Sequence, residues 1–139
     1  MTAREYLERP EAIGREIERR RVRINTLRRL ATRFSAGITD VRVQVSPDPS
    51  RMQEFLAEAA DEEQEIARLE KKRIRAAADA ALLISRLPEE KMTRIMELRY
   101  LDRWQWEDIM DEVDCSASHM YRLHQLVLDI LTPPPETED

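Results

Sequence analysis

The sequence has little of what turns, β-sheets and disulfide-linked folds require. Its 139 residues include two glycines and one cysteine, and aromatic residues make up only 5%. So few glycines, with abundant Glu, Arg, Ala and Leu, favour long helices over turn-rich β architectures. The single cysteine, Cys115, excludes an internal disulfide, which makes a cytoplasmic location the default expectation.

Long apolar runs and enzyme signatures are also missing. No apolar run approaches the roughly 20 residues of a membrane span, and the first residues contain no apolar signal-peptide core. There is no phosphate-binding glycine loop, no nucleophile elbow and no ordered Ser/His/Asp set. Cys115 and His119 are one helical turn apart, but no second pair completes a four-ligand zinc site. We therefore expect a non-enzymatic protein without membrane span, metal or other cofactor.

Charge is distributed unevenly along the chain. The net charge is −5, yet residues 1–45 carry +5 and residues 88–132 carry −5. Six of the N-terminal cations fall within residues 19–29, where they could bind phosphates or pair with the acidic run at residues 61–65. Both interpretations remain open at this point. Strong phosphate-driven binding by the acidic C-terminal part is disfavoured, because such binding comes from neutralised phosphates.

The first 87 residues carry two long helical patterns. Thr2-Ala-Arg-Glu5 has the form of a capping box that starts a helix near residue 3, and Pro10 fits a kink or the start of a second helix. Ser50 is a second capping signal. Apolar residues then recur at heptad spacing in both patterns: Ile13, Ile17, Ile24, Leu27, Ala31 and Phe34, then Met52, Phe55, Ala59, Ile66, Leu69, Ala76, Ala80, Leu83 and Leu87.

Three polar residues, Arg20, Glu62 and Arg73, interrupt these apolar stripes. The connector at about residues 35–49 contains Gly37, which can end a helix, and valines at 41, 43 and 45 that allow a short extended strip. The two patterns predict a coiled-coil-like antiparallel helical hairpin over residues 1–87. The same stripes would also serve a dimer, so the hairpin could close within one chain or between two.

Residues 88–132 predict three short helices, at about 89–101, 105–113 and 117–131. Only Asp114-Cys115-Ser116 separates the last two, which is the length of the turn in a helix-turn-helix. Spacing predicts a shared core and leaves five polar or small residues outward near the start of the third helix: Ala117, Ser118, His119, Tyr121 and Arg122. It leaves open whether His124 also faces outward. The tail at 133–139, rich in proline and acidic residues, is expected to be disordered.

Several short stretches carry a resemblance. Leu98-Arg-Tyr-Leu101, Trp106-Glu-Asp-Ile109 and Met120-Tyr-Arg-Leu-His124 resemble region 4 of sigma-70-type transcription factors. With the opening Met1–Leu7 and the Val45-Ser-Pro47 connector, the chain is similar to small phage-encoded proteins of unknown function that combine a helical hairpin with such a region. It departs from the sigma pattern in having Met110 where a small residue is usual, and Arg122 as the third helix's single fixed cation.

This resemblance implies an all-α phage or prophage transcription regulator whose partner is double-stranded DNA. The reading positions would fall on Ala117, Ser118, His119, Tyr121 and Arg122, which suit contacts with base edges and phosphates in the major groove. RNA polymerase and a second copy of the chain are further expected partners. The alternative is a protein-interaction module that binds RNA polymerase or a phage packaging protein and has no DNA site of its own.

Overall fold

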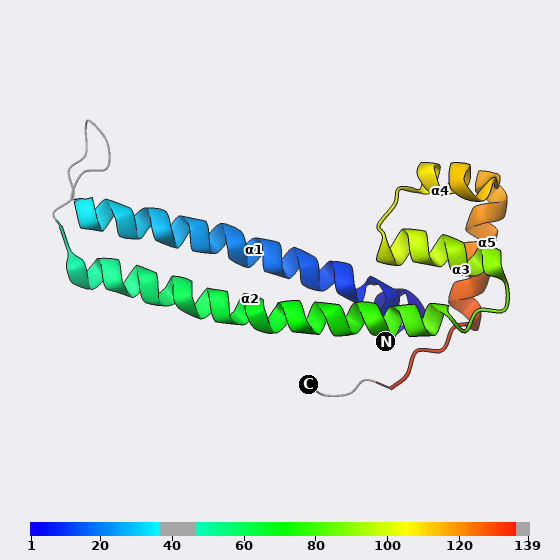
Figure 1. Ribbon diagram of the computed structural model, residues 1–139, viewed down its shortest axis with the longest axis horizontal. Helices are drawn as coiled ribbons and strands as arrows, with labels where there is room; N and C mark the ends of the chain where they lie inside the picture. The colour runs from blue at the N-terminus through cyan, green and yellow to red at the C-terminus, as the bar shows by residue number, and fades with distance from the viewer. Residues whose placement is uncertain (37–46, 136–139) are drawn as a thin grey trace. The chain divides into compact units, whose positions relative to one another are not determined.

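The computed structural model describes residues 1–36 and 47–135, and every regular element within them is a helix. The helices are α1 (Ala3–Ala36), α2 (Pro49–Ile84), α3 (Glu90–Met96), the π-helix η1 (Glu97–Leu101), α4 (Trp106–Val113) and α5 (Ala117–Ile130) (Figure 1). The predicted all-α class is therefore confirmed. The expected helix end at Gly37, the extended strip at residues 41–45 and tail residues 136–139 lie outside the described residues. Within the described part, no helix combines the length and the apolar character that crossing a membrane requires.

The start of α1 follows the predicted capping box. The Thr2 hydroxyl accepts a hydrogen bond from the Glu5 N–H at 3.1 Å, and the Glu5 carboxylate accepts one from the Thr2 N–H at 2.9 Å. The predicted restart at Pro10 is wrong, because α1 runs through it as one helix. Pro10 has no N–H for the carbonyl of Tyr6, and the Arg9 Nε donates to that oxygen instead, at 3.4 Å.

Helix α2 begins one residue earlier than its expected cap. The carboxylate of Asp48 accepts a hydrogen bond from the Arg51 N–H at 3.1 Å, which makes Asp48 the capping residue. Pro49 follows it at the first helical position, where proline is favoured. The prediction of Ser50 as the cap is therefore wrong, because Ser50 already lies inside the helix.

Two compact units make up the chain. The terminal unit comprises Met1–Ala12 and Arg73–Asp139, and the hairpin unit comprises Ile13–Lys72. Each long helix contributes to both units. The first turns of α1 thus belong with the C-terminal helices. The sequence instead suggested two domains divided at residue 87, and whether residues 1–87 and 88–132 fold independently stays a prediction.

In the hairpin unit, α1 and α2 lie side by side and run in opposite directions (Figure 1). Ile24, Leu27 and Ala59 are buried between them, and the rings of Phe34 and Phe55 stack with centroids 5.7 Å apart. These are residues of the two predicted apolar stripes, so heptad spacing correctly indicated the buried faces here.

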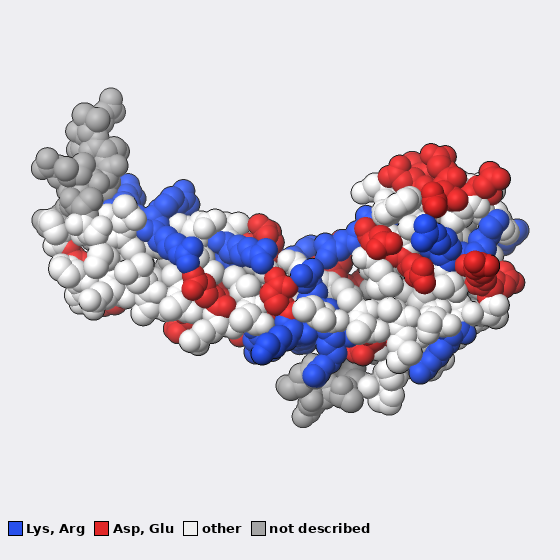
Figure 2. Space-filling view, in the orientation of Figure 1, with Lys and Arg blue, Asp and Glu red and all other residues white. Residues whose placement is uncertain are grey.

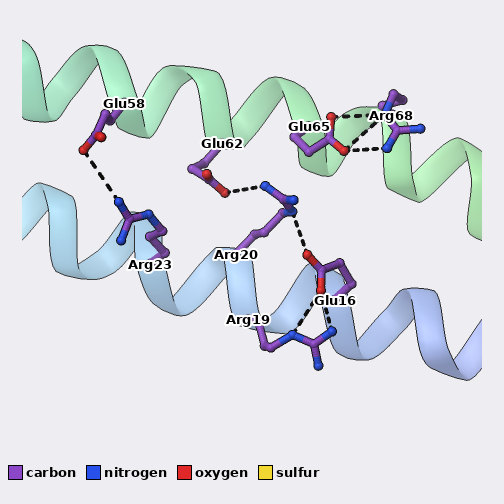
Figure 3. Close-up of polar contacts among 8 residues, drawn as sticks. All are labelled: Glu16, Arg19, Arg20, Arg23, Glu58, Glu62, Glu65 and Arg68. Atoms are coloured by element: carbon purple, nitrogen blue, oxygen red, sulfur yellow. Dashed lines mark hydrogen bonds and ion pairs between the residues drawn. The ribbon is translucent and has the colours of Figure 1, made fainter.

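Ion pairs flank this thin core (Figure 3). Two of the three polar interruptions of the stripes meet, since Arg20 donates to Glu62 at 3.0 Å. Arg23 lies 3.8 Å from Glu58 across the helix pair, as Figure 3 also shows. Two further pairs join the same helices, Arg28 with Glu63 and Arg21 with Glu70 at 3.1 Å. These contacts favour pairing over phosphate binding as the role of residues 19–29.

The terminal unit has a larger core. Tyr6 and Leu7 from α1 and Ala80, Leu83 and Ile84 from α2 pack with side chains from α3, η1, α4 and α5. The C-terminal side chains in this cluster are Met92, Ile95, Met96, Leu98, Tyr100, Ile109, Met120, Leu123 and Val127. The short C-terminal helices therefore share one core with the first turns of α1 and the last turns of α2.

Candidate nucleic-acid interface

The anchoring of α5 determines which of its side chains face solvent. Met120, Leu123 and Val127 are buried in the core of the terminal unit. At 3.6 residues per turn, this fixes the opposite face outward, where Ala117, Ser118, Tyr121 and Arg122 are all exposed. His119, the fifth predicted site residue, lies at the edge and is half-buried.

A short turn connects α4 to α5. Asp114 follows α4 in the left-handed conformation, with φ 50° and ψ 64°, and the Cys115 N–H donates to the Met110 carbonyl at 3.2 Å. This is the pattern of a Schellman motif, in which glycine is the usual left-handed residue and Asp an accepted one. Ser116 then caps α5 by accepting a hydrogen bond from the His119 N–H at 3.3 Å. The predicted cap is confirmed.

Two side-chain contacts order the outward face. The Arg122 Nη2 lies 2.8 Å from the Nδ1 of His119, one turn earlier on the same helix. The Tyr121 ring contacts the Trp106 ring edge-on at a centroid distance of 5.4 Å, although 49% of Tyr121 remains exposed. The five predicted site residues thus lie together on the first two turns of α5, with the hydrogen-bonding groups of Ser118, Tyr121 and Arg122 on an exposed surface.

His124 does not belong to this surface. The sequence left its orientation open; in the structure it is buried, and its Nε2 lies 2.6 Å from the Tyr100 hydroxyl. Its ring stacks on Tyr100 and receives the edge of Trp106 at 4.8 Å. Burial lowers the pKa of His124 from 6.5 to about 4, with Arg4 and Arg99 acting in the same direction. The histidine is therefore neutral at pH 7 and serves as a polar link between α5 and η1.

Tyr100, the partner of His124, lies in the π-helix η1. Its wider turn appears at Asp102, whose N–H donates to the Glu97 carbonyl five residues back. Such turns frequently occur at functional sites. Sequence spacing predicted only an ordinary helix over residues 89–101, and no signal in the residues distinguishes the two helix types.

Arg99 fixes the loop before α4. Its Nη1 donates to the Trp104 carbonyl at 3.1 Å, and its guanidinium lies 4.6 Å from the centroid of the Trp106 ring. The same Trp106 contacts Tyr121 and His124 of α5. The loop, α4 and α5 are therefore connected through one half-buried tryptophan.

The electrostatics around α5 are dominated by acids. Helix α4 carries Glu107, Asp108, Asp111 and Glu112, with Asp114 following it, and red side chains gather over α4 in Figure 2. Glu112 bonds to Arg94 at 3.2 Å. In α5, Arg122 is the only lysine or arginine. No group of three or more metal-ligating side chains occurs within the described residues.

A family model covers residues 35–132, which is well over half of the chain. The protein belongs to the family described as "Protein of unknown function (DUF1492)". The matched region runs from the end of α1 through α2 to α5. No curated protein and no solved structure matches the chain.

Proposed function

We propose that this protein is a DNA-binding transcription regulator of phage or prophage type, and that α5 enters the major groove of double-stranded DNA. The observation that carries the proposal is the two-sided character of α5. One face is anchored in the core by Met120, Leu123 and Val127, while the first two turns of the other face expose small and hydrogen-bonding side chains. A helix held in this way can reach base edges without reorganising.

Each exposed residue suits a particular contact. Ala117 and Ser118 are small enough to let the helix approach the bases closely. Arg122 can donate two parallel hydrogen bonds to guanine, and Tyr121 can donate one to a phosphate. The three-residue turn and the Ser116 cap support the proposal of a helix-turn-helix similar to sigma-70 region 4.

The charges set limits on this interaction. Arg122 is the only fixed cation on α5, and the neighbouring α4 is acidic, so one reading helix contributes little phosphate neutralisation. Two copies of the chain reading two half-sites would compensate, because a second binding event becomes effectively intramolecular. We therefore propose a homodimer on DNA. RNA polymerase is the further partner expected of a regulator.

Fluorescence anisotropy with fragments upstream of the neighbouring genes, at low and near-physiological salt, tests the proposal. We expect saturable binding to one fragment that survives competitor DNA, with a shallow salt dependence. Arg122→Ala should weaken that binding. Arg68→Ala, an exposed arginine of the hairpin unit bonded to Glu65, is the matched control and should not change it. Equal weak binding to all fragments, or no effect of Arg122→Ala, argues against the reading helix.

A second candidate function rests on the acidity of α4. Asp108, Asp111 and Glu112 line a concave surface together with Arg103, Trp104 and Gln105. Such a surface suits a basic region of RNA polymerase or of a packaging protein, which would make the chain an interaction module without its own DNA site. Asp108→Asn with Asp111→Asn separates the two functions. The pair of changes should leave DNA binding intact or tighten it, but should weaken docking on a basic protein.

A further inference from the structure

Helix α2 has an exposed apolar stripe within the terminal unit. Ile74 is 66% exposed and Leu82 is 58% exposed, and Ala78 is exposed midway between them. Residues spaced by four along a helix share a face. The three side chains therefore form one line, which we call the outer stripe.

The opposite face of the same segment is already occupied. Ala76, Ala80 and Leu83 are buried at 3%, 0% and 5% exposure. A helix packed on one side normally shows one apolar face and a polar one. Single exposed apolar residues are common, but an aligned set on a second face indicates a contact surface. Since the core of the terminal unit already covers the opposite face, the outer stripe is available to bind another molecule.

We propose that the outer stripe binds the outer stripe of a second copy of this chain, in antiparallel orientation about a twofold axis at Ala78. The order of side-chain sizes is symmetric, with a large residue four positions before the alanine and another four positions after it. Antiparallel pairing places Ile74 against Leu82 of the second copy, twice. Ala78 meets its own equivalent, and two methyl groups let the helices approach closely.

The charges beside the stripe are self-complementary in this register. Arg75 and Asp79 lie one turn apart along one flank. In antiparallel pairing about Ala78, Arg75 of one copy and Asp79 of the other are offset by two residues. At a rise of 1.5 Å per residue, this is about 3 Å along the helix axis. The twofold symmetry produces the same pair a second time. Asp79 keeps its contact with Arg9 at 3.4 Å. Ala77 and Ala81 on the other flank present no charge. A second copy matches both the sizes and the charges of this face.

The contact involves a few helical turns on each copy, which is less than a standard stable interface. We therefore expect association in the micromolar range or weaker, roughly 10⁻⁵ to 10⁻⁴ M. Sedimentation equilibrium of the full chain without DNA, up to several hundred micromolar, should show a mass rising from that of one chain towards that of two.

Ala78→Glu places two carboxylates at the proposed axis and should give a monomer at every concentration. Ala78 is exposed, so the thermal melt of this variant by circular dichroism should match the parent's. Ala57→Glu, at an exposed alanine of α2 in the hairpin unit, is the matched control and should leave association unchanged. A parent chain that stays monomeric, or a dimer that survives Ala78→Glu, overturns the proposal and leaves the stripe to a different protein.

Cysteine cross-linking tests the register. In a Cys115→Ser background, Ala78→Cys should form a disulfide-linked dimer on mild oxidation, because the two positions meet at the axis. Ile74→Cys alone should not cross-link, whereas an equimolar mixture of Ile74→Cys and Leu82→Cys chains should. Cross-linking of Ile74→Cys with itself would instead indicate a parallel pair and contradict the proposed arrangement. Because none of these measurements contains DNA, they do not depend on the proposed reading helix.

Discussion

The hairpin unit and the terminal unit each contain part of both long helices, yet they are stabilised differently. The eight largest side chains with less than 2% exposure among the described residues all belong to the terminal unit. The hairpin unit instead has a thin core around Ile24, Leu27 and Ala59, flanked by ion pairs that are partly or largely exposed. A helix pair can bury only one seam, whereas segments of six helices enclose a core on several sides. We therefore expect the terminal unit to depend on packing and the hairpin unit to tolerate change.

The largest expected effect comes from removing a central core side chain of the terminal unit. Ile109→Ala should lower the free energy of unfolding by about 3–4 kcal/mol, because it deletes buried methyl groups and leaves a cavity that packed neighbours cannot fill. Leu27→Ala in the hairpin unit should cost less, about 2 kcal/mol, since two helices can close up more readily. Urea unfolding of both variants measures the difference. Equal costs would remove the contrast between the units.

The buried Tyr100–His124 pair makes the terminal unit sensitive to acid. The folded state lowers the pKa of His124 to about 4 from 6.5, so between these pH values the unfolded chain binds a proton that the folded chain does not. Stability should therefore fall as the pH drops through this window and level off below it, by roughly 2 kcal/mol after allowance for solvent screening. Unfolding titrations from pH 7.5 to pH 3.5 measure the loss.

His124→Gln is the control for this prediction, because an amide can still bond to the Tyr100 hydroxyl but does not titrate. In that variant the loss of stability between pH 6.5 and pH 4 should largely disappear. Burial also raises the pKa of Tyr100, so its hydroxyl stays protonated throughout this range. An unchanged pH profile in His124→Gln would assign the acid sensitivity to other groups.

Loss of the α5 cap should have an intermediate effect. Ser116→Ala removes the acceptor of the His119 N–H and should cost about 1 kcal/mol in the free energy of unfolding. Ser118→Ala, two residues further along and exposed, should change it by less than about 0.5 kcal/mol. The two serines differ in position and not in chemistry, so thermal unfolding of the pair isolates the cap. Equal effects would mean that α5 begins elsewhere.

Local signals predicted much of the fold. The Thr2–Glu5 capping box, the Ser116 cap and the bounds of the three C-terminal helices depend on neighbours within four residues, and the sequence displays them directly. The apolar stripes and their interruptions also follow from periodicity. Even so, the meeting of Arg20 with Glu62 could be expected only once the helices were assumed to pair.

Three features could not be predicted because they depend on distant parts of the chain. Tyr6 and Leu7 join the core of the C-terminal helices, which no local pattern shows. The π-helix Glu97–Leu101 differs from an α-helix by one hydrogen-bond register, and its side-chain pattern is too short to reveal this. Spacing left the orientation of His124 open, and it is the contacts with Tyr100 and Trp106 that bury it. For the candidate site, the sequence correctly indicated the exposed side chains on the first two turns of α5; that they contact DNA stays a prediction.

The smallest expected effect tests whether ion pairs of the hairpin unit differ with burial. Arg20 and Glu62 are 30% and 19% exposed in their side chains, whereas Arg23 and Glu58 are 57% and 56% exposed and lie farther apart, at 3.8 Å. Exposed pairs contribute little because water and salt screen them. Double-mutant cycles with alanine should therefore give a measurable favourable coupling for Arg20–Glu62 and none for Arg23–Glu58. Raising the salt concentration should reduce the Arg20–Glu62 coupling only slightly, because surrounding residues partly shield that pair from solvent and ions. If both couplings were zero, the charges at the centre of the seam would serve to select the pairing of the helices rather than to stabilise it, and the stability of the hairpin unit would come from its thin apolar core alone.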